Sequence, residues 1–447
     1  MTLYIFTFSH IVRGSNVAIL GGGWAGLLVA KRLIENGIEN ISILEATKEG
    51  DQGGLLRSEV INGFTFDCGG PHLLFSRDRE ILSRINELLG DNVSERIRNN
   101  FVFYRGEHIQ YPFENGIYLL PPEKRVLFLE GIFKSMIFTA KNVNWKPENF
   151  LEWITGFFGD HLSKEYLIPY NEKVWKRPLD SMAADWVFTP GRLPFPSLSN
   201  MLKSAAGLPT TGYKEQAHFY YPKIGGISAL FSSLYKKVID SGVRYVNGVR
   251  VSSVRKGNEG DFVINGRILS KRVVSTIPLP ELLLSLDSKN YSKLADRFDY
   301  NSVAIVGVAI KGKTPDKTTI YVPDPKVIFH RYTWMSSLVP PNNSGRSNLI
   351  AEMTLPKGEN FDPERIRDEV IRGLVDMGVI DDENSILFTR LWFNKYGYPI
   401  YTMDHNAVRG EAISVLGDYG IKSVGRWGSW HYWNTDMVYK AVEDTLR

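Results

Sequence analysis

The feature that most constrains this chain is a glycine-rich turn between an apolar run and a helical pattern. The run NVAIL at 16–20 precedes GGGWAG at 21–26, and LLVAKRLIENG follows at 27–37. The turn satisfies G-x-G-x-x-G between a predicted strand and a predicted helix, the context in which that pattern indicates dinucleotide binding. A second predicted strand, ISIL at 41–44, ends at an acidic residue. Residues 16–47 are therefore predicted to form a βαβ unit.

Each part of this unit has its own chemical role. The helix that opens at Trp24 and Ala25 attracts an anion by about 0.3–1 kcal/mol. The acid at the end of the second strand accepts the hydroxyls of a ribose and favours an adenosine diol over a 2′-phosphate. The alternative is a plain glycine turn with a solvated glutamate. The predicted roles are a tight turn at Gly21, backbone approach to a pyrophosphate at Gly23, close strand–helix packing at Gly26, and ribose binding at Glu45.

A second glycine turn follows soon after the ribose acid. Gly53, Gly54 and Leu55 lie in DQGGLLRS at 51–58, which also contains Arg57. Such a turn would let the backbone pass close to a longer dinucleotide, although a lone Gly-Gly is usually only a hairpin turn. The first motif by itself does not separate NAD from FAD.

Composition narrows the class of protein further. The chain has 447 residues, which suggests roughly three domains. Its net charge of +4, without a basic tract, does not indicate a nucleic-acid binder. The single cysteine, Cys68, excludes an intrachain disulfide and a cysteine-based metal site, so no metal is predicted. No run approaches the roughly 20 apolar residues of a spanning helix, and a cytoplasmic protein is expected. The aromatic segment 128–138 is interpreted as a half-buried core helix rather than a membrane contact.

One motif is a false lead. Residues 307–314, GVAIKGKT, match the P-loop pattern G-x-x-x-x-G-K-[ST]. A P-loop must join a strand to a helix, whereas these residues read as the interior of a strand that leads to another strand. The match is predicted to be a coincidence.

The periodicities divide the chain into interleaved units. Residues 1–15 are read as an N-terminal extension, 76–214 as mostly helical, and 278–409 as rich in strands. The dinucleotide-binding unit is expected to be discontinuous, over 16–75, 215–277 and 410–447.

Several segments together resemble the amine-oxidase-like flavoproteins and, within them, the UDP-galactopyranose mutases. The general likeness rests on GGGWAG, Glu45 and GGLLRS. The narrower likeness rests on motifs in family order: GGPH at 69–72, YPFEN at 111–115, PYNEKVW at 169–175, FHR at 329–331, GYP at 397–399 and GRWG at 425–428 with Tyr432.

The resemblance implies a fold, a cofactor and a reaction. The fold is α/β, with a Rossmann-like FAD-binding domain interleaved with a helical domain carrying a mobile loop and an antiparallel-sheet substrate domain. The reaction is the interconversion of UDP-galactopyranose and UDP-galactofuranose, or of a related UDP-sugar, through a sugar adduct at flavin N5. It requires reduced FAD, hence a reductant such as NAD(P)H. The oligomeric state is left open.

The resemblance also assigns residues to the substrate. Arg192 and Arg331 would hold the departing diphosphate, the alternative being solvation at loop ends. Tyr170 would stack on the uracil and Asn171 would hydrogen-bond to it, while Trp175 is either a sugar contact or core. Glu114 stands where eukaryotic members carry an amide. One of Tyr321, Tyr398 and Tyr432 is expected to donate to phosphate or sugar rather than to a backbone carbonyl.

At the cofactor, His72 would lie beside the isoalloxazine, although a lone histidine is more often structural. Arg426, after Gly425, would favour the anionic reduced flavin, and the helix opening at Asn434 and Thr435 would meet its pyrimidine end. Val251 is also placed at the cofactor.

Departures from the family concern Pro196, Leu338 and Asn434. Bacterial members carry a basic residue in place of Pro196 and an acid in place of Asn434. Eukaryotic members carry a tyrosine in place of Leu338. A different sugar or nucleotide is therefore an alternative substrate. Two other functions stay open: an FAD-dependent oxidoreductase of the amine or protoporphyrinogen oxidase type, and a non-catalytic flavin-binding protein.

Overall fold

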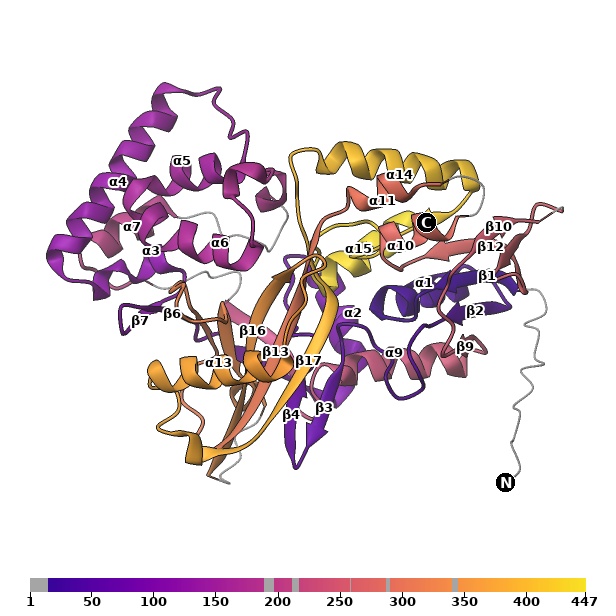
Figure 1. The fold of residues 1–447 in the computed structure, drawn as a ribbon, viewed down its shortest axis with the longest axis horizontal. Helices are drawn as coiled ribbons and strands as arrows, with labels where there is room; N and C mark the ends of the chain where they lie inside the picture. The colour runs from indigo at the N-terminus through magenta and orange to yellow at the C-terminus, as the bar shows by residue number, and fades with distance from the viewer. Residues whose placement is uncertain (1–14, 189–196, 211–216, 258, 287–289, 340–344) are drawn as a thin grey trace.

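The computed structural model describes residues 15–188, 197–210, 217–257, 259–286, 290–339 and 345–447 (Figure 1). An α/β region around β1 and α1 lies at one end of the molecule and a helical region around α4 and α5 lies at the other. A large sheet with β13, β16 and β17 stands between them. Residues 1–14 of the expected N-terminal extension lie outside the described residues, and Ser15 already begins β1.

The α/β region is built on a seven-stranded sheet. Strands β12, β1, β2 and β9 run parallel in that order, with β18 parallel to the other side of β12, and β10 and β11 extend the sheet antiparallel. The strands are β1 (Ser15–Leu20), β2 (Ile41–Leu44), β9 (Arg244–Val246), β10 (Val254–Lys256), β11 (Phe262–Ile264), β12 (Ile268–Ser275) and β18 (Lys422–Ser423). The expected βαβ unit is confirmed by the parallel pairing of β1 with β2.

Helices cover both faces of this sheet because the side chains of a strand alternate between its faces. Val17 and Ile19 of β1 belong to one apolar cluster, and Ala18 and Leu20 to another. The first cluster includes residues of α1 (Trp24–Glu35), α2 (Arg79–Leu89), α9 (Ser228–Asp240) and α15 (Thr435–Thr445). The second includes residues of α10 (Leu279–Ser285), α11 (Ser292–Asp296) and α14 (His405–Tyr419).

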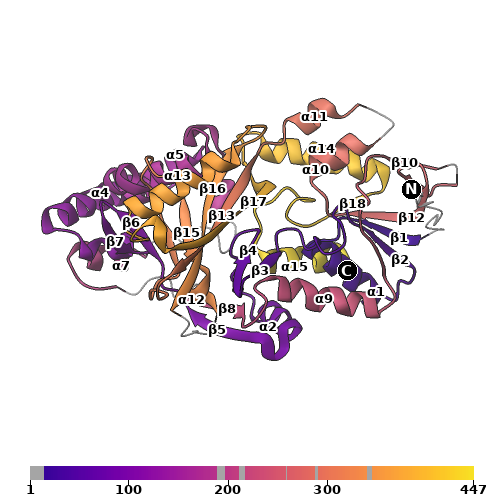
Figure 2. The same ribbon diagram turned by 60° about the horizontal axis from the view of Figure 1, so that its bottom comes forward.

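The middle sheet has the strand order β17-β13-β16-β15-β14-β6-β7 (Figure 2). All its pairings are antiparallel except that of β14 with β6. The strands are β6 (Phe101–Tyr104), β7 (Glu107–Gln110), β13 (Tyr300–Lys311), β14 (Thr319–Tyr321), β15 (Arg331–Trp334), β16 (Arg346–Pro356) and β17 (Ile386–Pro399). Helix α13 (Pro363–Asp376) covers one face, and α12 (Met335–Leu338) follows β15.

Two features of the middle sheet bear on the sequence analysis. The P-loop-like residues begin at Gly307, inside β13, so the interpretation of that match as a strand is confirmed. A hairpin is predicted at 101–113 within the mostly helical segment, and β6 and β7 confirm it; the hairpin also pairs with β14 and so extends the middle sheet. Strand pairing therefore joins the predicted helical unit to the predicted strand-rich unit at this point.

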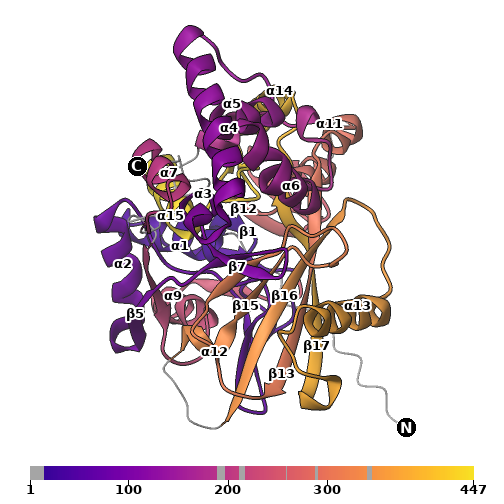
Figure 3. The same cartoon turned by 90° about the vertical axis from the view of Figure 1, so that its left-hand side faces the viewer.

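The helical region stands over one end of the middle sheet (Figure 3). It comprises α3 (Phe113–Gly116), α4 (Pro122–Lys141), α5 (Phe150–Leu162), a π-helical turn (Ser163–Leu167), α6 (Ile168–Trp175) and α7 (Leu198–Ala205). Short 3₁₀ turns occur at Gly90–Asn92, Ile117–Leu119, Leu179–Ser181, Asp185–Phe188 and Glu383–Ser385. Two further strand pairs, β3 (Ser58–Ile61) with β4 (Phe64–Asp67) and β5 (Val93–Ile97) with β8 (His218–Pro222), complete the fold.

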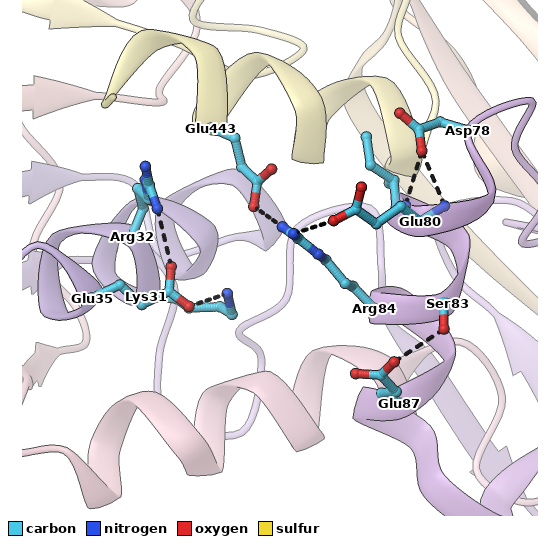
Figure 4. A network of polar contacts seen from close by, with 10 residues as sticks. Lys31, Arg32, Glu35, Asp78, Glu80, Ser83, Arg84, Glu87 and Glu443 are labelled. Atoms are coloured by element: carbon cyan, nitrogen blue, oxygen red, sulfur yellow. Dashed lines mark hydrogen bonds and ion pairs between the residues drawn. The ribbon is translucent and has the colours of Figure 1, made fainter.

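A surface network joins helices that are distant in the sequence (Figure 4). Arg84 of α2 donates to Glu443 of α15 at 2.7 Å and to Glu80 at 2.5 Å. Nearby, Lys31 of α1 donates to Glu35. Exposed pairs of this kind contribute at most about 1 kcal/mol each. The network therefore adds little to the apolar packing that holds α1, α2 and α15 together.

Candidate functional site

The larger of two adjoining cavities lies at the carboxyl ends of β1 and β2, where ligands bind in open α/β sheets. Its volume is about 630 Å³. We call it the glycine-loop cavity. Twelve residues predicted at the cofactor line it: Gly21, Gly23, Trp24, Ala25, Glu45, Gly53, Gly54, Leu55, Val251, Arg426, Asn434 and Thr435.

The glycines of the loop differ in what surrounds them. A Cβ on Gly26 would collide with the carbonyl oxygen of Gly21, and one on Gly22 would collide with the Tyr245 hydroxyl. A Cβ on Gly23 would meet nothing nearer than 4.0 Å. Gly26 and Gly22 are thus required for packing within the protein, whereas Gly23 borders open space. That is the arrangement a backbone needs to approach a phosphate.

Glu45 is oriented by the loop itself. Its Oε2 accepts from the backbone N–H of Gly22 at 2.8 Å, and its Oε1 accepts from the N–H and the hydroxyl of Thr47 at 2.8 and 2.9 Å. Each carboxylate oxygen can accept more than one hydrogen bond. The carboxylate is therefore held in place with capacity left for a ribose diol.

The opposite wall of the cavity brings in the start of the last helix. The indole N–H of Trp24, at the start of α1, donates to the carbonyl oxygen of Thr435 at 3.1 Å. Asn434 is the N-cap of α15 and makes no side-chain capping bond. Two helix N-termini thus border one cavity, and both favour negative charge there.

A second cavity of about 230 Å³ shares a wall with the first. We call it the arginine cavity. The shared wall consists of Leu55, His72, Arg426, Asn434 and Thr435. Of the residues predicted at substrate or in catalysis, those that line the arginine cavity are His72, Tyr170, Asn171, Trp175, Tyr321, Arg331, Tyr398 and Tyr432.

Arg426 is fixed at the junction by several aromatic rings. Its guanidinium lies 4.7 Å from the ring centroid of Tyr432 and 5.8 Å from that of Tyr398. It donates to the carbonyl oxygen of Gly397 at 2.5 Å. Burial lowers its pKa, yet an arginine remains charged at neutral pH. A positive charge therefore stands where the two cavities meet.

Arg331 and Glu352 form a buried bidentate pair on neighbouring strands. Arg331 Nε and Nη2 donate to the two Glu352 oxygens, each at 2.7 Å, and Nη2 also lies 3.3 Å from the Tyr398 hydroxyl. Glu352 is only 1% exposed. Burial acts to lower the Arg331 pKa, but the Glu352 carboxylate and the nearby Tyr398 and Tyr170 together outweigh it, so the net effect is a raised pKa. The pair fixes the guanidinium before any ligand arrives and leaves its other N–H groups for that ligand.

Several tyrosines line the arginine cavity. The rings of Tyr111 and Tyr321 lie 4.5 Å apart, and Tyr170 meets Tyr321 edge-on at 5.7 Å. Tyr398 and Tyr432 also meet edge-on, at 5.3 Å. Burial raises the pKa values of Tyr170, Tyr321 and Tyr398. These phenols are neutral hydrogen-bond donors at physiological pH.

On α6, Asn171 and Trp175 bind each other. The Trp175 indole N–H donates to Asn171 Oδ1 at 3.1 Å, and Asn171 Nδ2 donates to the Leu167 carbonyl at 2.8 Å. Both side chains line the arginine cavity. Part of the Asn171 amide is therefore used within the helix, and one N–H and one lone pair remain for a ligand.

Glu114 borders a third, smaller cavity of about 60 Å³, which we call the Glu114 pocket. Its wall includes Tyr111, Tyr170, Asn171 and Tyr321, which also line the arginine cavity. Glu114 is buried on α3, and burial raises its pKa to about 7. The three cavities thus adjoin one another in a row between Glu45 and Glu114.

Not every predicted residue lines these cavities. Gly26, Gly425 and Arg57 do not line the cavities, and Arg57 donates to the Asp51 carbonyl instead. Leu338 is buried in α12, away from both. Arg192 and Pro196 lie outside the described residues.

Three further residues, to which no role was assigned from the sequence, line the arginine cavity: Arg98, His330 and Glu352. The Arg98 guanidinium lies 4.9 Å from the Phe75 ring centroid. Burial, reinforced by the nearby Arg331 charge, keeps the His330 pKa well below its usual value, so this imidazole is neutral. Glu352 could have been found from the sequence, because it is the only charged residue in the apolar stretch NLIAEMTL at 348–355 and a buried charge needs a partner.

Similarity to known proteins agrees with this geometry. Residues 19–88 match the model of an NAD(P)-binding Rossmann-like domain. A solved structure of reduced UDP-galactopyranose mutase superposes with a TM-score of 0.86 over 97% of this chain and 94% of that one, at 24% identity.

The same fold occurs in oxidases. A putative protoporphyrinogen oxidase from Exiguobacterium sp. 255-15 has a TM-score of 0.73 at 17% identity, over 97% of this chain and 98% of that one. Putrescine oxidase bound to putrescine has a TM-score of 0.60 at 15% identity, over the same shares. This chain has the UDP-galactopyranose mutase fold. The fold implied by the sequence resemblance is therefore confirmed, and the reaction is a separate question.

Proposed function

We propose that this chain is a flavin-dependent sugar-nucleotide mutase that interconverts UDP-galactopyranose and UDP-galactofuranose, or a related UDP-sugar. The observation that carries the proposal is the wall shared by the glycine-loop cavity and the arginine cavity. A sugar nucleotide bound beside Arg331 would place its sugar against the Arg426 end of a bound dinucleotide.

The residues of the glycine-loop cavity fit FAD. Glu45 would hold the ribose, the backbone at Gly23 and the N-terminus of α1 would hold the pyrophosphate, and the N-terminus of α15 with Arg426 would face the flavin ring. When bound and reduced, the flavin supplies an electron-rich ring nitrogen to the anomeric carbon of the sugar. A fixed positive charge at Arg426 favours the anionic reduced form at this position.

The chain's own residues would bind and orient the substrate. The N–H groups of Arg331 that Glu352 leaves over would bind the oxygens of a diphosphate, and Arg98 adds a second cation to the same cavity. The phenol hydroxyls of Tyr398, Tyr432 and Tyr321 would donate to phosphate or sugar oxygens. The base would extend past Tyr170 toward the Glu114 pocket. Arg192 is proposed as a further diphosphate ligand from its sequence segment alone.

The lining of the arginine cavity favours this reaction over oxidation of an amine or a porphyrinogen. Such substrates call for a long apolar channel, whereas guanidinium, phenol and amide groups line this cavity. Because proteins with the same fold include oxidases, an FAD-dependent oxidoreductase is the second candidate function.

The test is product chromatography after incubation of the protein with UDP-galactofuranose. The dithionite-reduced protein should form UDP-galactopyranose, and the oxidised protein should not. Equal rates in both states would refute the redox requirement. Amine- or porphyrinogen-dependent peroxide formation, without any response of the flavin absorbance to UDP, would establish the oxidase instead. Replacing dithionite first with NADH and then with NADPH tests which of them can reduce the protein.

A further inference from the structure

The arginine cavity is built from two regions of the fold, and their relative position sets its length. Helix α6 of the helical region supplies Tyr170, Asn171 and Trp175. Strands β14 and β15 of the middle sheet supply Tyr321 and Arg331, which stand opposite each other in the register of these strands. In Figure 1, α6 lies on the side of the helical region that faces this sheet. The distance between the two groups of residues therefore depends on how α6 docks against the two strands.

Lys173 of α6 makes a polar contact across this junction. Its Nζ donates to the carbonyl oxygen of Val322 at 2.9 Å and to that of Asp324 at 2.7 Å. Both carbonyls belong to residues 322–330, which we call the β14–β15 connection. Val322 directly follows Tyr321, the last residue of β14. One side chain thus ties the helix on one side of the cavity to the connection on the other side.

The β14–β15 connection passes this contact on to Arg331, because its two ends are hydrogen-bonded to each other. The N–H of Val322 donates to the carbonyl oxygen of His330 at 2.8 Å. The N–H of His330 in turn donates to the carbonyl oxygen of Glu352 at 2.9 Å. A shift of the connection relative to α6 would therefore shift the start of β15, where Arg331 lies.

A lysine at this place costs free energy that an apolar side chain would not. Lys173 is only 8% exposed. Burial lowers its pKa to about 7, with a further lowering by Lys176, while Asp324 acts in the opposite direction. A methionine of similar length would fill the space without the cost of burying an amino group. What the lysine adds is direction, because donation to two carbonyls fixes the helix and the connection in one relative position.

We propose that Lys173 is a positioning residue that sets the spacing between the base end of the arginine cavity, at Tyr170 and Asn171, and its diphosphate end, at Arg331. A ligand that carries both a base and a diphosphate needs this spacing, whereas a ligand with the diphosphate alone does not. Lys173 itself lines neither end. The inference rests on the proposed function for its ligand, UDP, but its first test needs no ligand.

The first test is hydrogen–deuterium exchange in the unliganded full-length protein. Lys173→Met should raise the exchange rate of the N–H groups in 322–330 at least about tenfold, because two hydrogen bonds from a charged group are lost. Arg177→Met is the matched control. Arg177 also links the end of α6 to the sheet, through Asp299 at 2.8 Å, but does not bind the connection. The control should leave exchange in 322–330 unchanged. Equal exchange in the wild type and Lys173→Met overturns the proposal.

The second test compares two ligands by calorimetry. Lys173→Met should raise the Kd of UDP about tenfold and change the Kd of inorganic pyrophosphate less than about twofold. In the reduced protein, KM for the UDP-sugar should rise while kcat stays near the wild-type value, because the sugar and flavin contacts are kept. Equal weakening of both ligands would show general damage to the cavity and overturn the spacing role, as would unchanged affinity for both.

Two further measurements keep the outcomes apart. Circular dichroism and flavin content check that the variants fold. Lys173→Gln, whose shorter amide cannot replace both hydrogen bonds, is the second variant and should show the same difference between UDP and pyrophosphate. A wild type that binds pyrophosphate but not UDP would overturn the proposed function and the spacing role with it. The exchange experiment would still show whether Lys173 ties α6 to the connection.

Discussion

The glycine-loop cavity and the arginine cavity share a wall but are built in different ways. Three neighbouring segments of the sequence, 21–25, 44–46 and 53–56, supply much of the first cavity, mainly through backbone conformation. The second is lined by side chains of α6, β14, β15, β16 and β17, and sheet register sets their positions. The glycine turns of the first site follow from local sequence, whereas the second site as a whole is a property of the assembled fold.

The largest expected effect is that of Arg331→Ala, which tests whether the arginine cavity depends on its buried pair. Glu352 would be left buried without its cation, which costs about 3–5 kcal/mol in unfolding free energy. Denaturant unfolding measures this loss. The double variant Arg331→Met/Glu352→Met should recover most of the stability while turnover remains lost. Full turnover in the double variant would show that Arg331 has no role in the reaction.

The next largest effect is a pH dependence of protein stability caused by Glu114, which lies beside the arginine cavity. Its pKa is about 7 in the folded protein against 4.5 when exposed. Stability from the protonated carboxyl is complete below pH 4.5 and is lost as the pH rises to 7, by about 3 kcal/mol. Glu114→Gln should therefore gain about that much over the wild type between pH 4.5 and 8, measured as the difference in their unfolding free energies. A constant difference would contradict the raised pKa.

Glu114 also bears on the base of the proposed substrate. A protonated carboxyl offers one donor and one acceptor, as a glutamine amide does, and can therefore pair with the N3–H and a carbonyl of uracil. UDP affinity, measured by calorimetry, should fall above pH 7 in the wild type and stay constant in Glu114→Gln. The same fall in both proteins would place the base elsewhere.

A matched pair of alanine variants tests whether the glycine-loop cavity binds its ligand through closely approaching backbone. Gly26→Ala should destabilise the fold by about 1–3 kcal/mol, because its methyl group meets the Gly21 carbonyl. Gly23→Ala should fold with near-normal stability yet lose bound flavin, because its methyl group enters the space of the phosphate. The flavin-to-protein absorbance ratio and the thermal midpoint separate the two effects. Loss of stability in both variants, with flavin retained, would contradict the assignment.

The smallest effect is expected outside both cavities. Arg84→Ala removes the exposed pairs with Glu80 and Glu443 and should cost no more than about 1 kcal/mol, less at high salt. Urea unfolding at two ionic strengths measures it. A loss of stability as large as that of Arg331→Ala would mean that exposure to solvent does not determine how much these ion pairs contribute.

These differences explain what could be predicted from the sequence. The loop and Glu45 lie within 25 residues, and their chemistry follows from local turns and helix ends, so the βαβ unit could be predicted. Arg331 and Tyr398 came from a family resemblance. Glu352 was missed because its partnership with Arg331 depends on the register of β15 with β16, where the two residues stand opposite each other. Arg98 was missed because nothing distinguishes it from the neighbouring Arg96 in the sequence.

The hydrogen bond between Trp24 and Thr435 joins positions 411 residues apart. Since α15 and the segment before it complete the wall of the glycine-loop cavity, a nascent chain that has emerged only as far as the middle sheet still lacks Arg426, Asn434 and Thr435 of that wall. Domains generally fold as units during synthesis, so a domain cannot complete itself before its last segment has emerged. Here the ribosome must deliver nearly the whole described chain before a dinucleotide can be enclosed, so cofactor loading is a late event in the maturation of this protein.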